Sequence, residues 1–397
     1  MLPQDPFGQD YLRLTLEIHK HIDGYIDAYY GPEALRAEVN AAPPRQPAAL
    51  LDDVRRLQDN IPTADPARAA YLKAVLRAIE CTVRMLQGET VDYLDEVYRI
   101  YDIRPRQVAE STFEAAHREL DELLPGRLGD GLAERLAAWR KGFEIDAGRA
   151  LELLELARAE TRQRTAAFIE LPDEESVEIR LTSNQPWNAY NWYLGNGRSL
   201  IEFNTDMPLH VAALLGTFAH EGYPGHHTEG VLKEIGLFRE RGYAEQAVPL
   251  LHSPSAVISE GIATTALYII FPDDSHYDWN VEVMFPAAGL PAEPGLAERM
   301  QRIAKASEKL RYVNGNAAIL YHTGQLDKAG AIDYLRTYGL ATAERAAKSL
   351  SFMTHPLFRS YTFTYSVGYD LIAASPDPVA TFRRLLTEQV LPAALAN

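Results

Sequence analysis

The chain has almost no cysteine and no long apolar run. Cys81 is the single cysteine among 397 residues, which excludes an intramolecular disulfide, and we expect it to be a buried small residue on a helix. No window approaches 18 uninterrupted apolar residues, the minimum for a membrane-spanning helix. The first seven residues contain neither the basic nor the apolar stretch of a secretory leader. A cytoplasmic protein is therefore expected.

Basic residues are also few relative to acidic ones. The chain has 39 Lys and Arg against 55 Asp and Glu, a formal net charge of −16 at pH 7. Nucleic acids and anionic membranes bind to basic patches, so neither is expected as a partner. This length favours two parts, which we predict as a helical N-terminal wall or scaffold over 1–170 and a catalytic region over 171–397. The oligomeric state is left open.

Helical periodicity dominates the sequence, and a mainly α fold is predicted. Helices are expected over about 10–29, 66–87, 91–101, 106–123, 131–141, 146–168, 294–322, 326–338, 341–352, 357–373 and 378–391. Between 172 and 206 apolar and polar residues alternate, and Gly195-Asn196-Gly197 is a turn signal. This pattern predicts a small sheet in an otherwise helical chain.

The stretch 220–227, His-Glu-Gly-Tyr-Pro-Gly-His-His, concentrates histidines next to a carboxylate. It follows the apolar run 209–219, which is typical of a buried helix, where a His-Glu pair is costly unless it is paired or bound to a metal. Imidazoles can hold a zinc ion, and a glutamate can take a proton from its water. A metal site is therefore favoured over a core helix followed by a surface turn.

The spacing of these histidines differs from the usual His-Glu-x-x-His pattern, in which both rings lie on one helix face. The residue four after His220 is Pro224, and His226 is six residues on, about 600° around a regular helix. Pro224 and Gly225 both disfavour a continuous helix. We predict a break over 223–225 that returns His226 to the side of His220. His227 is then expected to support the ligands or contact substrate; the alternative is that His227 replaces His226 as the ligand.

Glu260 is predicted to be the third metal ligand, on a second helical run over 258–267. Its neighbour Gly261 is small enough to let another helix approach. Two histidines and one glutamate leave a fourth position for water, as in catalytic zinc sites. Glu229 competes locally and is expected to be a solvated charge or a partner of the ligands. The alternative for Glu260 is an ordinary carboxylate near a helix N-terminus.

The segments HEGYPGHH and SEGIA resemble the DUF885 family of bacterial proteins, which is grouped with the gluzincin-type zinc peptidases. Residues 24–32 also resemble a segment of some members. The resemblance implies a mainly helical metallopeptidase architecture with a small β-sheet beside the zinc-binding helix and a central cleft. It implies one Zn²⁺ per chain, held by His220, His226 and Glu260, with Glu221 as general base.

Further candidates lie in the aromatic segment 355–369. Tyr365 belongs to a Tyr-x-x-Gly element that resembles one in the family, and it is predicted to stabilise the oxyanion. Arg359 is predicted to bind a substrate carboxylate in a bidentate way. The alternatives are a structural tyrosine and a buried ion-pair partner. An exposed edge strand of the sheet could pair with the backbone of a peptide.

The predicted function is a zinc-dependent metallopeptidase that cleaves short peptides with metal-activated water. Glu221 and Tyr365 are the predicted catalytic residues, and Arg359 and His227 the predicted substrate contacts. Two alternatives stay open: a zinc hydrolase of another small amide or ester, and a non-catalytic helical metal-binding protein. The native metal and the choice between endo- and exo-cleavage are also open.

Overall fold

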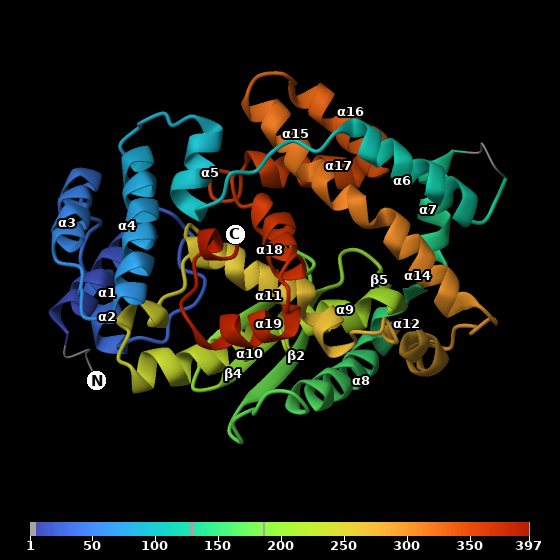
Figure 1. The fold of residues 1–397 in the computed structure, drawn as a ribbon, viewed down its shortest axis with the longest axis horizontal. Helices are drawn as coiled ribbons and strands as arrows, with labels where there is room; N and C mark the ends of the chain where they lie inside the picture. Colours follow the sequence, from blue (N-terminus) through green and yellow to red (C-terminus); the bar gives the residue numbers. More distant parts are fainter. Residues whose placement is uncertain (1–4, 128–130, 186, 397) are drawn as a thin grey trace.

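The computed structural model describes residues 5–127, 131–185 and 187–396. Its fold is mainly helical with a small sheet, as predicted (Figure 1). The first helices are α1 (Pro6–His19), α2 (Glu33–Ala41), α3 (Pro47–Asp59), α4 (Pro66–Leu86), α5 (Tyr93–Tyr101), α6 (Glu110–Leu123), α7 (Leu132–Lys141) and α8 (Ala147–Ala166). Helix α4 begins as its sequence predicts, because the Asp65 side chain accepts from two backbone N–H groups and proline follows it.

Helix α1 is shorter than the predicted helix over 10–29. It ends at His19, and the following residues form turns. The backbone there pairs with a distant segment instead: Ile26 forms an isolated bridge with Leu250, and the Asp27 N–H donates to the Pro249 carbonyl at 3.0 Å. This long-range pairing replaces helical hydrogen bonds.

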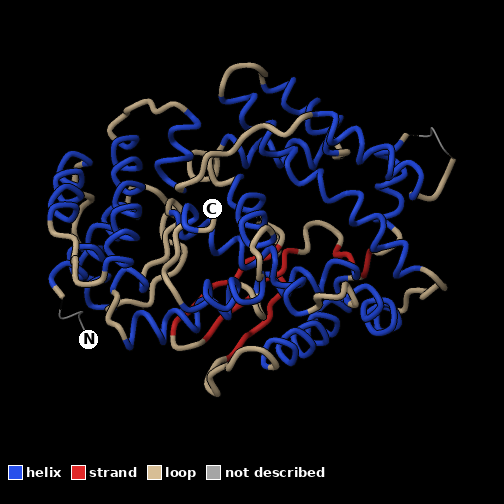
Figure 2. Tube along the Cα trace, viewed as in Figure 1, coloured by secondary structure: helices blue, strands red, loops and turns tan. Residues whose placement is uncertain are grey.

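A three-stranded sheet forms in the region where strand periodicity predicts it. Its strands are β2 (Ser176–Thr182), β3 (Ala189–Gly195) and β4 (Arg198–Asn204). The order is β2-β4-β3, with β2 parallel and β3 antiparallel to β4. The strands cross the lower centre of Figure 2, in contact with α8, α9 and α10. Strand β3 is therefore an edge strand next to the helices that carry the histidine motif. Two short strands, β1 (Glu144–Ile145) and β5 (Leu209–His210), form a second antiparallel pair.

The remaining helices follow the sheet along the chain. They are α9 (Val211–Glu221), α10 (His226–Lys233), α11 (Pro254–Ile270), α12 (His276–Trp279), α13 (Phe285–Ala288), α14 (Leu296–Ser307), α15 (Val313–His322), α16 (Lys328–Gly339), α17 (Ala343–Thr354), α18 (Phe363–Ala373) and α19 (Pro378–Thr387). Helices α15, α16 and α17 lie far from the sheet, at the top of Figure 1. Short π- or 3₁₀-helical segments are η1 (Glu234–Glu240), η2 (Ala244–Ala247), η3 (Asn280–Met284), η4 (Glu308–Tyr312) and η5 (Pro392–Ala394). The predicted helix over 294–322 is thus divided at η4. Within the described ranges, no helix combines the length and apolarity that crossing a bilayer requires.

Helices α11 and α18 lie side by side in the centre of the molecule (Figure 1). Their backbones touch at two glycines: a Cβ at Gly261 would lie 2.7 Å from the Gly368 carbonyl oxygen, and one at Gly368 would lie 2.4 Å from the Val257 carbonyl oxygen. The close approach predicted for Gly261 is confirmed. It brings the tyrosines of the α18 segment against the Glu260 side of α11.

The hydrophobic cores combine residues from both sides of position 170. One core joins α1, α3 and α4 to the segment around η2, and another joins α5 to α11 and the C-terminal helices. The predicted division into 1–170 and 171–397 is therefore not marked by separate cores and stays a prediction.

Candidate metal centre

The helix break predicted from the Pro-Gly pair is present. Helix α9 ends at Glu221 and α10 begins at His226. The Gly225 N–H donates to the Ala219 carbonyl at 3.0 Å, which turns the chain back on the end of α9. A Cβ at Gly225 would lie only 1.9 Å from the His220 carbonyl oxygen. Only glycine fits this close approach, and it places the start of α10 beside the end of α9.

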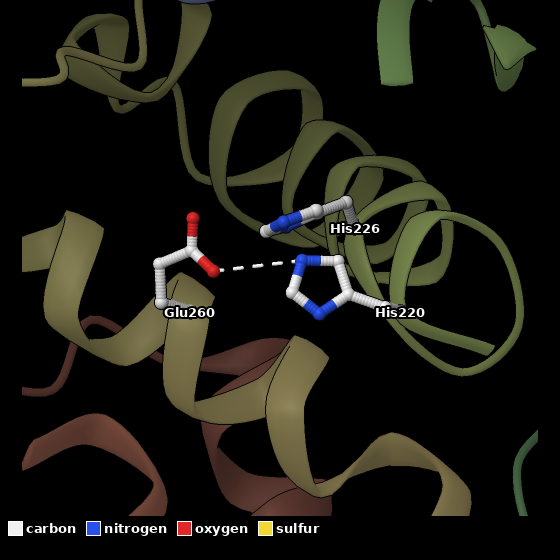
Figure 3. Close-up of side chains that lie close together, drawn as sticks. All are labelled: His220, His226 and Glu260. Atoms are coloured by element: carbon white, nitrogen blue, oxygen red, sulfur yellow. Dashed lines mark ion pairs between the residues drawn. The ribbon is translucent and has the colours of Figure 1, made fainter. Parts of the chain in front are cut away.

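His220, His226 and Glu260 meet at this break (Figure 3). One ligand atom from each residue lies within 4.8 Å of those from the other two. The centroids of the two imidazole rings lie 4.9 Å apart, and the ring planes are almost perpendicular, at 89°. His220 Nε2 lies 3.5 Å from Glu260 Oε2. The structure therefore brings the three predicted ligands together and favours His226 over its neighbour as the second histidine.

The surroundings of Glu260 fit a bound cation. Its Oε1 accepts a hydrogen bond from the Tyr361 hydroxyl at 2.7 Å, but its buried Oε2 has no hydrogen-bond partner among the described residues. Burial raises the pKa of Glu260 to about 8. An unsatisfied buried carboxylate oxygen is costly, and a metal ion would satisfy it. Two imidazole nitrogens and one carboxylate oxygen form the donor set of catalytic zinc, although other divalent ions accept the same set.

Glu221, the predicted general base, lies beside His220. Its Oε1 is 3.9 Å from His220 Nε2, and its side chain is 9% exposed. Burial, together with the charges of Glu260 and Asp27, raises the pKa of Glu221 well above its usual range. Strand β3 holds the end of α9 in place, because Asn191 Nδ2 donates to the Glu221 carbonyl at 2.5 Å. Glu221 is thus positioned by both the helix and the edge strand.

Tyr365 reaches the same place from α18. The centroid of its ring lies 5.7 Å from that of Tyr361, whose hydroxyl donates to Glu260, and both tyrosine hydroxyls oppose the rise in the Glu260 pKa. Burial of the hydroxyl end and the charges of Glu260 and Glu221 raise the pKa of Tyr365 well above its usual range, so the hydroxyl stays a donor. The residue as a whole is 38% exposed. Tyr361 was not predicted, although it lies one helical turn before Tyr365.

Asp27 is a second residue that the sequence did not single out. It lies within residues 24–32, and the sequence suggested no role for any residue of that stretch. The Tyr190 hydroxyl of β3 donates to Asp27, and the charge of Asp27 raises the pKa of Glu221 and Glu260. Burial raises the pKa of Asp27 itself. The charge of a third carboxylate therefore acts on two carboxylates of the predicted site.

Arg359 lies in an ion pair with Glu96. Its Nε donates to Glu96 Oε1 at 3.0 Å, and its Nη2 donates to Glu96 Oε2. Glu96 is fully buried, and the Tyr93 hydroxyl donates to the Arg359 carbonyl at 2.7 Å. The fork of the guanidinium is already used by a carboxylate of the protein. Arg359 thus has the ion-pair role left open as the alternative, and its predicted contact with substrate stays a prediction.

His227 is also not placed to touch substrate. It is fully buried, with Nδ1 2.8 Å from Ser199 Oγ and Nε2 2.9 Å from Glu175 Oε2. Glu175 also accepts from Arg162 Nε at 2.7 Å and from the Tyr223 hydroxyl. One step along α10 turns a side chain by about 100°, so His227 faces the sheet when its neighbour faces the metal centre. The predicted substrate contact is therefore corrected to a buried structural cluster.

A cavity of about 300 Å³ lies elsewhere, between α7 and α14. It is lined mainly by apolar side chains, among them Trp139, Phe143 and Phe285, and by none of the predicted site residues. The predicted central cleft therefore stays a prediction.

No family model matches the sequence, and no curated protein matches it. Two similar solved structures are named as candidate lipoproteins. The one from Colwellia psychrerythraea is 14% identical, with a TM-score of 0.52 over 87% of this chain and 65% of that one. The one from Shewanella oneidensis, of unknown function, is 11% identical, with a TM-score of 0.52 over 96% of this chain and 68% of that one. The chain thus spans about two thirds of the length of both structures, and at these identities the likeness is one of fold.

Proposed function

We propose that the chain is a zinc-dependent hydrolase, and specifically a metallopeptidase of short peptides, as its resemblance to the DUF885 family implies. One observation carries the proposal. The ligand atoms of His220, His226 and Glu260 converge within 4.8 Å around a buried carboxylate oxygen without a hydrogen-bond partner, and Glu221 lies beside them. These are the donor set and the proton acceptor that hydrolysis with activated water needs.

In this mechanism His220 of α9, His226 of α10 and Glu260 of α11 would hold the ion. Zinc, when bound, polarises the scissile carbonyl and lowers the pKa of its water. Glu221 accepts the proton of the attacking water and passes it to the leaving amine, a task that suits a carboxylate within reach of the ligands. The Tyr365 hydroxyl donates a hydrogen bond to the oxyanion.

The edge strand supports a peptide as substrate. Strand β3 is at one side of its sheet, and its Asn191 is hydrogen-bonded to the Glu221 carbonyl. A peptide that adds to β3 as a further strand would have its backbone aligned beside the base. Trp192 and Leu194 are exposed on this strand and offer apolar surface to substrate side chains.

The cytoplasmic location of the protein stays a prediction from the sequence.

The proposal is tested first by elemental analysis of protein purified without chelator. We expect about one zinc per chain in the wild type and most of it lost in Glu260→Ala. No zinc in the wild type, even after zinc is added back, would overturn the proposal.

Activity is tested on the zinc-loaded protein with a peptide library and with a panel of small amides and esters. Glu221→Gln should keep the metal and lose turnover by roughly 10²–10⁴-fold, because a neutral amide cannot accept the proton. Full activity in that variant would contradict the base assignment. Cleavage of the small amides or esters alone would favour the other class of zinc hydrolase.

A further inference from the structure

A chain of hydrogen bonds leads away from His226 into the protein. Its Nδ1 lies 3.1 Å from Ser259 Oγ, the Ser259 hydroxyl donates to Glu229 Oε2 at 2.5 Å, and Lys233 Nζ donates to Glu229 Oε1 at 2.6 Å. The side chains of Glu229 and Lys233 are only 10% and 12% exposed. Glu229 is therefore neither a metal ligand nor a solvated charge.

The direction of these bonds follows from what each group can donate. An ionised carboxylate only accepts, so the bond to Glu229 uses the single proton of the Ser259 hydroxyl. The Ser259 oxygen can then only accept from His226, so the proton of the neutral imidazole is on Nδ1. The lone pair on Nε2 is left free, and that is the form in which an imidazole binds a metal.

We propose that Ser259 and Glu229 are positioning residues that hold His226 in the Nδ1–H tautomer, with Nε2 presented to the metal ion. This inference rests on the metal site of the proposed function. It adds to that site a relay made of a neutral hydroxyl and a carboxylate whose charge is paired with Lys233.

The sequence positions explain why the relay forms here. Glu229 is three residues after His226, so both project from the same side of α10, and Lys233 is one turn further. Ser259 directly precedes Glu260 on α11. Helix α11 therefore supplies one metal ligand and, from the adjacent residue, the support of another. The relay also ties α10 to α11, which fixes the distance between two ligands that come from different helices.

The first measurement is the histidine tautomer in the metal-free wild type, read from ¹⁵N shifts of the imidazole by NMR. We expect His226 to be protonated on Nδ1. Protonation on Nε2 would overturn the proposal. This readout needs neither activity nor a variant that folds, so it tests the relay even if the protein binds no zinc and the proposed function fails.

The second measurement is zinc affinity, by competition with a chromogenic chelator. Removing a partner of this kind costs roughly 10–100-fold in metal affinity, and we expect that loss in Ser259→Ala. Ser259→Thr keeps the hydroxyl and should restore most of the affinity. Glu229→Gln should weaken binding as well, because its amide nitrogen can donate to Ser259 and turn the hydroxyl proton toward His226.

Thr265→Val is the matched control for a general loosening of α11. The Thr265 hydroxyl is buried one turn after Glu260 and donates to the Gly261 carbonyl at 2.7 Å. Its removal should leave zinc affinity within about twofold while affecting stability. Equal affinities in Ser259→Ala and the wild type would overturn the relay and leave the proposed function standing. Equal losses of zinc affinity in Ser259→Ala and Thr265→Val would also overturn the relay.

Discussion

The Gly225→Ala substitution should destroy the geometry that unites the two histidines. The new Cβ would lie 1.9 Å from the His220 carbonyl oxygen and 2.5 Å from that of Ala219. Both contacts are to backbone atoms at the end of a helix, which cannot move aside as a flexible side chain does. Gly225 is at φ −74°, so the cost arises from space and not from an unusual φ angle.

Inserting one methyl group into a packed site usually costs about 1–3 kcal/mol. We expect the upper end of that range or more here, because the shorter contact is well inside van der Waals distance. A loss of about 3 kcal/mol is roughly a hundredfold change in the folding equilibrium. Any relaxation that relieves the clash must move α10 away from α9, so zinc affinity should fall together with stability.

The assay is urea denaturation of the metal-free protein, followed by chelator competition for zinc. Gly236→Ala is the matched control, because a Cβ there meets nothing within 4 Å and the residue lies in the helical segment η1. A Gly→Ala exchange at a helical position with room for the Cβ is expected to be neutral or stabilising by about 0.5–1 kcal/mol. The reasoning is refuted if Gly225→Ala matches Gly236→Ala in both stability and zinc affinity.

Three further outcomes are expected. Tyr361→Phe removes the 2.7 Å hydrogen bond to Glu260 Oε1 and should weaken zinc binding roughly tenfold in the chelator assay; unchanged affinity would contradict this orientation of Glu260. Burial alone would raise the pKa of Glu175, but its hydrogen-bond partners lower it from 4.5 to about 2. The stability that ionised Glu175 contributes to the fold is therefore present above about pH 4.5 and lost as the pH falls toward 2. Urea midpoints measured from pH 7 to 3 should drop less steeply in Glu175→Gln than in the wild type. Parallel curves for the two proteins would contradict this role of Glu175. Gly261→Ala should lower the free energy of unfolding, measured by urea denaturation, by about 1–3 kcal/mol, because the new Cβ would press on the backbone of Gly368. A variant as stable as the wild type would mean that α11 and α18 can separate.

The sequence predicted the helix break well because its causes are local. Proline without an N–H and glycine without a side chain act within a few residues, so the ends of α9 and α10 could be expected from residues 220–227 alone. The strand pattern over 172–206 was equally local. The C-terminal extent of helix α1 was overestimated, because Ile26 forms a bridge to Leu250, more than 200 residues away, in place of the last predicted turns.

The roles of single side chains were harder to predict where they depend on a distant partner. Arg359 has a form that suits a substrate carboxylate, but the packing of α5 places the buried Glu96 against it. His227 has the same chemistry as His226, but Ser199 of β4 and Glu175, which directly precedes β2, lie on its side of α10. In both cases the carboxylate was present in the sequence, and nothing local indicated the pairing.

The sequence by itself therefore determined the mainly helical fold class and the break between the two histidines, and it indicated the residue types of the candidate metal centre. These follow from backbone geometry and from ligand chemistry over short spans of the chain. Only the tertiary structure decided that Glu260 joins the histidines, that Asp27, Tyr361 and Ser259 surround them, and that Arg359 does not. The physical reason is that such contacts depend on which helices pack together. Packing is set by the shape of the whole core, as at the glycines of α11 and α18, and not by the residues that meet at the site.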